Sequence, residues 1–262
     1  VDNPKQTIPA AVNVAVQNAA GEFIVRLDAH SIPDPFYVEL CIKALKDGVA
    51  ECVGGIWVIA PGGDGWIARS IAAAAAHPIA VGDARYRFTR QAAFVDTVPF
   101  GAFRKELFMN LGGFNERLLT NEDYEFFARI RKGNGRIWLN PSIRSIYFAR
   151  KNLPALISQY WRYGFWKYKM LKEFPDTLRW RQALPPLFVF TLILLMLLSL
   201  VSKIFLWALL SILGIYIFIL IAVGIKTAII KKDLSLIMGM PLAIICMHIS
   251  WGLGFLYSII KK

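Results

Sequence analysis

The stretch that decides the fold is FIVRLDAH, residues 23–30. Its first part, Phe23–Leu27, is a short run rich in strand formers that ends abruptly at Asp28. Working outward, helices are expected over 8–20, 34–46, 66–76 and 120–132, and strands over 53–60, 94–98, 137–140 and 143–147. Strands that alternate with helices indicate an α/β domain with a largely parallel sheet.

The composition changes beyond Ala183. The whole chain has 262 residues, is 56% hydrophobic and carries a net charge of +12, but after Ala183 the charges nearly vanish. The runs 183–202, 204–225 and 234–260 are each long enough to cross a bilayer, which takes about 20 apolar residues. A buried soluble bundle is the alternative. Three successive runs exceed what a small core can use, so we expect about three transmembrane helices.

The basic excess fits a membrane setting, because Lys and Arg collect on the cytoplasmic side. Lys226, Lys231 and Lys232 lie between the second and third runs. If residues 1–180 are cytoplasmic, three spans place Lys261 and Lys262 outside, which this rule disfavours, so the topology of the last span stays open. No basic stripe with interleaved aromatic residues is visible, and we therefore expect no nucleic-acid partner.

Asp28 and His30 directly follow the first predicted strand. Ligands of open α/β sheets bind beyond the carboxyl ends of strands. A sharp turn lets both side chains face one point, where a carboxylate and an imidazole could hold a divalent cation that neutralises a leaving diphosphate. The alternative is a turn Asp beside a solvent-facing His.

Asn121-Glu122-Asp123 opens the helix expected over 120–132. A carboxylate at a helix start can act as a general base toward an acceptor hydroxyl. The alternative is structural, because Thr120-x-x-Asp123 resembles a capping box and acidic residues favour first turns in any case. Asp96, at the end of the strand predicted over 94–98, could help to shape an acceptor pocket.

Gln159 and Arg162 share a helical face in a segment dense with aromatic residues and lysines. Arg binds phosphate oxygens bidentately. The alternative is an amphipathic helix that anchors the chain at the membrane surface, and both descriptions can hold together.

In this order, Asp28-x-His30, the Asp96 strand with its Gly-Ala-Phe-Arg turn, Gly-Gly-Phe-Asn-Glu, Asn-Glu-Asp and Gln-x-x-Arg-Tyr resemble the family 2 glycosyltransferases of the GT-A fold. The chain is most similar to the succinoglycan-type exopolysaccharide subgroup, in which Asp-Ala-His stands where relatives carry Asp-x-Asp. The resemblance covers roughly residues 1–186.

This resemblance implies an α/β GT-A (nucleotide-diphospho-sugar transferase) domain over 1–153, incomplete at its N-terminus, an interfacial segment over 154–182, and transmembrane helices over 183–262. It implies inverting transfer from a nucleotide-sugar donor to a lipid-linked or polysaccharide acceptor, at the cytoplasmic face of the membrane and in contact with its lipids. The implied cofactor is Mg or Mn. The implied site residues are Asp123 as catalytic base, Asp28 and His30 as metal ligands, and Asp28, Asp96, Glu122, Gln159 and Arg162 as substrate contacts.

Two departures accompany the resemblance. The family's Gln-x-x-Arg-Trp ends here in Tyr163, which casts doubt on processive synthesis more than on transfer. Family members also begin with a strand–helix–strand unit that reads the nucleotide base, and nothing before Val1 supplies it, so part of the nucleotide pocket is expected to be missing. A polyprenyl-phosphate glycosyltransferase and a non-catalytic membrane scaffold remain as alternative functions.

Overall fold

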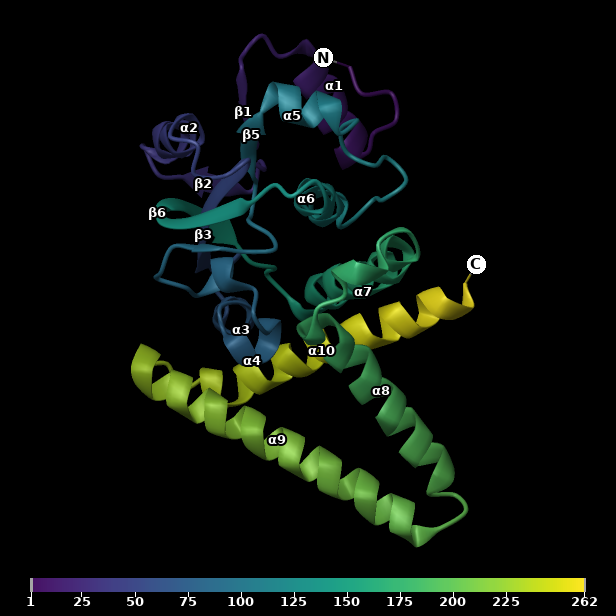
Figure 1. The fold of residues 1–262 in the computed structure, drawn as a ribbon. Coiled ribbons are helices and arrows are strands. Elements are labelled where there is room, and N and C mark those ends of the chain that lie inside the picture. Colours follow the sequence, from purple (N-terminus) through teal and green to yellow (C-terminus); the bar gives the residue numbers. More distant parts are fainter. Residues whose placement is uncertain (1, 262) are drawn as a thin grey trace. The chain divides into compact units, whose positions relative to one another are not determined.

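The computed structural model describes residues 2–261 (Figure 1). The chain divides into two compact units. The first, here called the sheet unit, comprises the chain up to Val58 together with Ala84–Tyr147 and Lys169–Thr177. The second, called the helical unit, comprises Ile59–Asp83, Phe148–Tyr168 and the chain from Leu178 onward. The predicted domain bounds of 1–153, 154–182 and 183–262 stay a prediction.

The sheet has six strands in the order β1-β5-β3-β6-β2, with β4 paired to β6. Their bounds are Phe23–Val25 (β1), Ser31–Pro33 (β2), Cys52–Ala60 (β3), Ala93–Phe94 (β4), Ala102–Arg104 (β5) and Ile137–Phe148 (β6). β5 pairs antiparallel with β1 and β3, and β6 pairs antiparallel with β2 and β4. Backbone hydrogen bonds join Cys52 to Arg136 and Ala149 to Ala60, so β3 and β6 run in the same direction.

The expectation of a largely parallel sheet is therefore wrong, because the sheet is mixed. That expectation assumed that each helix returns the chain to a parallel neighbour. Instead the short β5, which was not predicted, lies between β1 and β3 and runs against both. The two strands expected over 137–140 and 143–147 are one strand, β6, that continues through Pro141.

Most helices of the sheet unit pack on an aromatic core, and the one over Tyr37–Lys46 packs on a second cluster that includes Val53 and Ile143. They are α1 (Ile8–Asn18), α2 (Tyr37–Lys46), α5 (Lys105–Asn110) and α6 (Glu122–Lys132), with the 3-10 turns η1 (Arg85–Arg87) and η2 (Pro175–Thr177). Phe126 of α6 contacts Phe103 and Phe108, and all three side chains are fully buried. This packing fixes the start of α6 relative to β5. α2 begins three residues later than predicted, because the backbone carbonyl of Asp34 accepts a hydrogen bond from the Tyr37 amide and closes a turn there.

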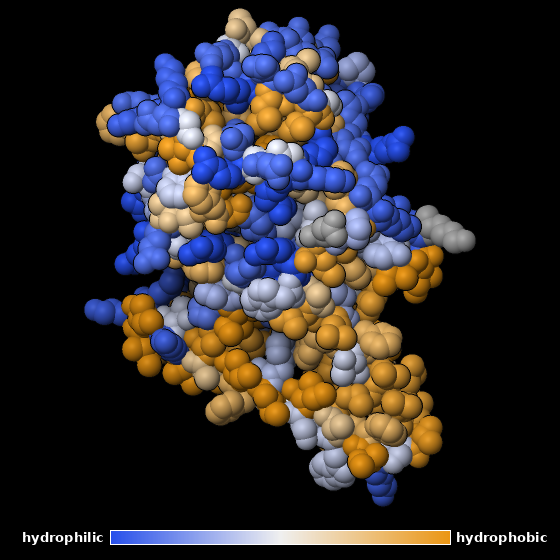
Figure 2. Space-filling model, in the orientation of Figure 1, coloured by the Kyte–Doolittle hydropathy of each residue, from blue (hydrophilic) through white to orange (hydrophobic). Residues whose placement is uncertain are grey.

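The helical unit contains α3 (Trp66–Ala75), α4 (Pro78–Val81), α8 (Trp180–Leu198), α9 (Lys203–Lys231) and α10 (Leu236–Ile260), and most of α7 (Leu153–Glu173). α8, α9 and α10 are long and apolar enough to cross a membrane. They confirm the three apolar helices expected from the sequence. Figure 2 shows hydrophobic residues gathered over α8 and α9, as expected for a surface in contact with lipid.

Candidate active site

A single arginine holds two of the predicted carboxylates together. Arg26 follows β1 directly, and its Nε lies 3.1 Å from Oδ1 of Asp28. Its two terminal nitrogens lie 3.4 Å from Oε1 of Glu122 at the start of α6. The Arg26 and Glu122 side chains are only 13% and 7% exposed. The structure thus brings together two motifs that are 96 residues apart in the chain.

Arg26 is a site residue that was not predicted from the sequence, because it lies within the run Phe23–Leu27 that predicts a strand. A charged residue inside an otherwise apolar run that ends in Asp28 was the available signal, because a buried charge requires a partner.

Burial and the repulsion between neighbouring carboxylates raise the pKa values of Glu122 and Asp123. Burial, followed by the charge of Asp123, raises the pKa of Glu122 to about 7, although Arg26 opposes the shift. Burial likewise raises the pKa of Asp123 against the effect of Arg26. Burial by itself lowers the pKa of Arg26, but the charges of Asp123, Asp28 and Glu122 outweigh it and raise the pKa. The cluster therefore combines a fixed positive charge with carboxyl groups that hold protons more tightly than usual.

The start of α6 presents this pair of carboxylates without a capping box. Thr120 Oγ1 donates to the carbonyl of Leu119, and the N-cap position belongs to Asn121, whose φ is +68°. The capping-box alternative is therefore wrong. Asp123 uses Oδ1 to accept the Tyr124 amide at 2.6 Å. The left-handed backbone of Asn121, a conformation that Asn tolerates better than most residues, turns the chain into the helix just before the two acids.

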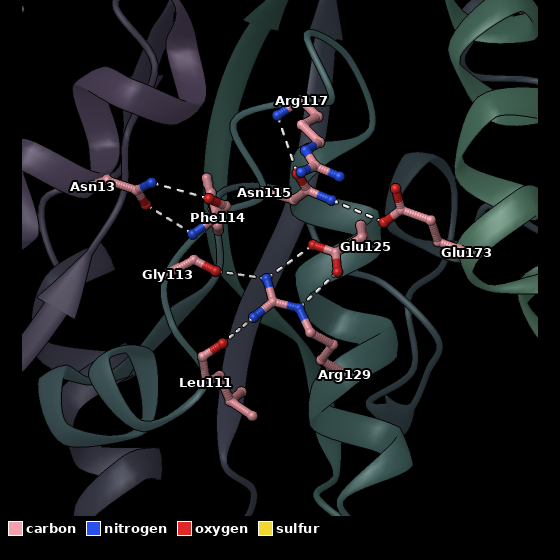
Figure 3. Close-up of polar contacts among 9 residues, drawn as sticks. All are labelled: Asn13, Leu111, Gly113, Phe114, Asn115, Arg117, Glu125, Arg129 and Glu173. Atoms are coloured by element: carbon pink, nitrogen blue, oxygen red, sulfur yellow. Dashed lines mark hydrogen bonds and ion pairs between the residues drawn. The ribbon is translucent and has the colours of Figure 1, made fainter.

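A partly buried arginine supports the loop that leads to α6 (Figure 3). Arg129 binds both carboxylate oxygens of Glu125, at 2.6 and 2.8 Å, and also the carbonyl oxygens of Leu111 and Gly113. On the other side of the loop, Asn13 both donates to and accepts from the backbone of Phe114. These contacts fix the Gly-Gly-Phe-Asn-Glu segment against α1 and α6, and thereby hold the acids that follow it.

Asp96 lies beside the same helix. It accepts a hydrogen bond from the Tyr124 hydroxyl at 2.7 Å. The residue follows β4 by two positions, since that strand ends at Phe94, earlier than predicted. Asp96 thus joins β4 to α6, and its role in an acceptor pocket stays a prediction.

His30 lies on an aromatic stack. Its ring meets Tyr147 edge-on at a centroid distance of 5.2 Å. Tyr147 stacks in parallel on Trp57 at 3.9 Å, and the Arg87 guanidinium lies 4.9 Å above the Trp57 ring. His30 itself is exposed, so its imidazole is accessible to a ligand.

Asp28 and His30 suit a divalent cation whose remaining coordination positions are filled by the substrate and water. The hydroxyl and amide of Ser31 both bind the Asp28 carbonyl and close the turn between the two donors. Across residues 2–261, no group of three His, Cys, Asp or Glu side chains is placed to hold a metal. Mg²⁺ is commonly bound through one or two carboxylates plus substrate phosphates and water. A two-donor set beside an exposed surface matches that pattern better than an all-protein cage.

Gln159 and Arg162 belong to α7 in the helical unit. Gln159 is 6% exposed, and its amide donates to the Tyr163 hydroxyl at 2.8 Å. Arg162 is exposed. Tyr163 in turn contacts Trp251 of α10. The first residue of the motif therefore positions the last, and Arg162 is more exposed than either. Contacts of Gln159 and Arg162 with substrate stay a prediction.

Comparison with known proteins gives consistent matches. Residues 1–112 match the family described as glycosyl transferase family 2. The chain is 29% identical over 188 residues to the succinoglycan biosynthesis protein ExoA of Rhizobium meliloti, a match that covers 71% of this chain and 56% of that protein. The chain thus spans little more than half the length of this relative.

A second relative is the Methanococcus voltae dolichyl N-acetyl-α-D-glucosaminyl phosphate 3-β-D-2,3-diacetamido-2,3-dideoxy-β-D-glucuronosyltransferase. It is 25% identical over 266 residues, which cover 99% of this chain and 77% of that protein. Among solved structures, a mannosyltransferase from Pyrobaculum calidifontis in complex with GDP-Man and Mn²⁺ matches with a TM-score of 0.54 and 16% identity, over 98% of this chain and 68% of that one. Residues 1–112 therefore match glycosyl transferase family 2, and the chain has a GT-A-like mixed sheet and three apolar helices.

Proposed function

We propose that the protein is an inverting glycosyltransferase that moves a sugar from a nucleotide-sugar donor to a lipid-linked glycan or polysaccharide acceptor at the membrane. The observation that carries this proposal is the cluster of Asp28, Glu122 and Asp123 around Arg26, which joins the end of β1 to the start of α6. Ligands of sheets with helices on their faces bind at such strand ends.

Asp123 is the proposed catalytic base. The acceptor hydroxyl oxygen attacks the anomeric carbon as the bond from that carbon to the diphosphate oxygen breaks, and the hydroxyl proton passes to the carboxylate. Asp123 uses Oδ1 for the Tyr124 amide, so Oδ2 can receive the proton. Its raised pKa suits this role, because a base works best when its pKa approaches the working pH. Arg26 and Glu122 hold the neighbouring groups in place.

Asp28 and His30 are the proposed ligands of Mg or Mn. When bound, the cation would act as a Lewis acid that neutralises charge on the departing diphosphate. The contact between Arg26 and Asp28 orients that carboxylate before substrate arrives. The Pyrobaculum mannosyltransferase, solved in complex with Mn²⁺, supports a divalent cation, and the choice between Mg and Mn belongs to experiment.

The names of the relatives and the apolar helices support the proposed acceptor class. One relative is named for succinoglycan biosynthesis and the other for transfer to a dolichyl-linked sugar phosphate. An enzyme that uses such acceptors works where they reside, and the three apolar helices supply a membrane attachment. We place the catalytic domain at the cytoplasmic face of the membrane, where nucleotide-sugars are available.

A scaffold that merely retained the fold is the competing function. Burying carboxylates so that their pKa values rise costs folding free energy, and packing alone gives no reason to bear that cost. The cluster therefore favours an enzyme.

The test is release of nucleoside diphosphate from UDP-, GDP- and dTDP-sugars by the membrane-embedded protein with Mg or Mn. Slow hydrolysis without acceptor is expected from the wild type with one donor. Asp123→Asn should reduce the rate at least 100-fold, the scale of general base catalysis, and Asp28→Asn should abolish the metal dependence. Asp47→Asn, an exposed residue after α2, is the matched control and should leave the rate unchanged. Equal rates in the Asp123 and Asp47 variants would refute the assignment.

A further inference from the structure

α10 differs from the other two apolar helices in what surrounds it. Half of its most apolar window is buried within the protein, against 17% for α8 and 6% for α9. Most of its exposed side chains form one stripe at steps of three or four residues, and Ile259 is exposed beside it. The stripe comprises Met238, Leu242, Leu253, Tyr257 and Ile260, with the partly exposed Cys246 and Ile249 between them. α10 therefore presents one apolar face, and protein covers the rest.

Part of the cover comes from α8 and α9, which approach α10 closely at Gly252 of α10 and at Gly224 of α9, and part comes from two helices that carry charge. At the start of α10, a Cβ on Gly239 would collide with the Ser70 hydroxyl of α3, a helix that also bears the exposed Arg69. In its second half, α10 touches α7 backbone to backbone, since a Cβ on Gly254 would collide with the carbonyl oxygen of Trp161. Tyr257, almost at the end of α10, still packs on Trp161. α7 carries Arg162, which is exposed.

The two charge-bearing helices leave the sheet at one place. α3 follows β3 after a short turn, and α7 follows β6 in the same way. The ends of these two strands are neighbours, because the Ala149 amide donates to the Ala60 carbonyl at 2.9 Å. α3 and α7 therefore enter the helical unit side by side. α10 contacts α3 near its first residue and α7 near its last, so both of its ends lie against helices that follow neighbouring strand ends.

α8 and α9 behave differently, as a hairpin. Asp83 pairs with Arg179 and Arg181 at the start of α8. Asp233, just after α9, pairs with Arg69 at 2.8 Å. The turn between the helices makes no such contact: Leu200 and Val201 are 84% and 85% exposed. In Figure 1 the two helices diverge from α10 toward this turn.

We propose that α8 and α9 cross the bilayer as a hairpin, and that α10 lies along the membrane surface with its apolar stripe in one leaflet. Residues 236–260 carry no Asp, Glu, Lys or Arg, so α10 is not amphipathic by itself. Its exposed apolar stripe and the charge-bearing α3 and α7, packed on its other sides, together form an amphipathic surface suited to that position. The 29 residues of α9 extend about 43 Å, enough to cross with a tilt. Within residues 2–261 the membrane is then crossed twice, and Lys261 lies on the same side as the sheet unit.

The distribution of charge agrees with two crossings. Arg179, Arg181, Lys231 and Lys261 fall on the near side, and Lys203 falls at the far turn. Cytoplasmic loops are enriched in Lys and Arg. Two crossings therefore remove the conflict that three crossings created at the C-terminal end.

The experiment compares cysteine labelling by a membrane-impermeant maleimide in sealed cells, before and after permeabilisation. Cys41 and Cys52 are buried, and Cys246→Ser removes the remaining native thiol. Lys261→Cys should share the labelling pattern of Asp47→Cys in the sheet unit and show the opposite pattern from Val201→Cys.

Two outcomes overturn the proposal. If Lys261→Cys labels together with Val201→Cys, α10 crosses the membrane. If Val201→Cys labels together with Asp47→Cys, the hairpin does not cross it. An epitope inserted after Lys261 and read by antibody on the same cells repeats the comparison without depending on thiol reactivity. None of these readings requires the protein to be a glycosyltransferase.

Discussion

Glu122→Gln should change how the stability of the protein depends on pH. Burial and the charge of Asp123 raise the pKa of Glu122 from its ordinary 4.5 to about 7. Between these values the folded state holds a proton that the unfolded state has released, so stability falls as pH rises through this window. Each pH unit is worth about 1.36 kcal/mol. The rise therefore corresponds to a loss of about 3 kcal/mol between pH 4.5 and 7, and Gln, which does not titrate, should not show it.

The assay is denaturant or thermal unfolding in detergent at pH 5, 6, 7 and 8. The wild-type curve should decline toward pH 8, and the Glu122→Gln curve should be flatter by about 3 kcal/mol over the window. Glu116→Gln is the control, because hydrogen bonds from Lys5 and Asn13 lower the pKa of Glu116 and keep it charged throughout this range. If wild type and Glu122→Gln give parallel curves, Glu122 does not titrate near neutrality and the electrostatic account of the cluster is wrong.

Three further changes test the packing around the site and in the helical unit. Gly164→Leu should destabilise the protein by about 1–3 kcal/mol, because a Cβ there would collide with the Trp251 carbonyl oxygen, whereas Gly214→Leu in α9 meets nothing within 4 Å and should be neutral in thermal unfolding. Glu125→Ala should cost about 3–5 kcal/mol by leaving the Arg129 guanidinium without its carboxylate; a loss below 1 kcal/mol in denaturant unfolding would contradict this. Tyr124→Phe removes the hydrogen bond to Asp96 and should cost about 1.5–3 kcal/mol, and an unchanged unfolding midpoint would count against that contact.

The local features of the fold could be predicted from the sequence. The strand before Asp28, the helix after Asn121 and the three apolar helices are set by residues adjacent in the chain. β5 was missed because three residues, Ala102–Arg104, are too short to show an alternating pattern. The direction of the strands was predicted wrongly because it depends on which strand β5 joins, and a local pattern does not carry that information.

The sequence predicted several residues of the candidate site, but it did not predict the contacts between them. Asp28 and the two acids at the start of α6 were identified from their positions after a strand and at a helix start. Arg26 connects these acids through contacts between residues far apart in the chain, and such contacts exist only because the fold brings the end of β1 next to the start of α6. The left-handed Asn121 was likewise hidden, since Thr120 offered a more ordinary helix cap that the backbone does not use. The family resemblance, carried by ordered motifs, is confirmed by the match over residues 1–112.

The most direct measurement of the central claim is transfer of radiolabelled sugar from nucleotide-sugar donors into the organic-solvent-extractable fraction of membranes that contain the protein. The account predicts metal-dependent incorporation with one donor, and its loss in Asp123→Asn at an unchanged level of folded protein in the membrane. Incorporation that persists in Asp123→Asn would contradict the catalytic assignment. A folded wild type that incorporates no label from any of the UDP-, GDP- or dTDP-sugars would contradict the proposed transfer to a lipid-linked acceptor.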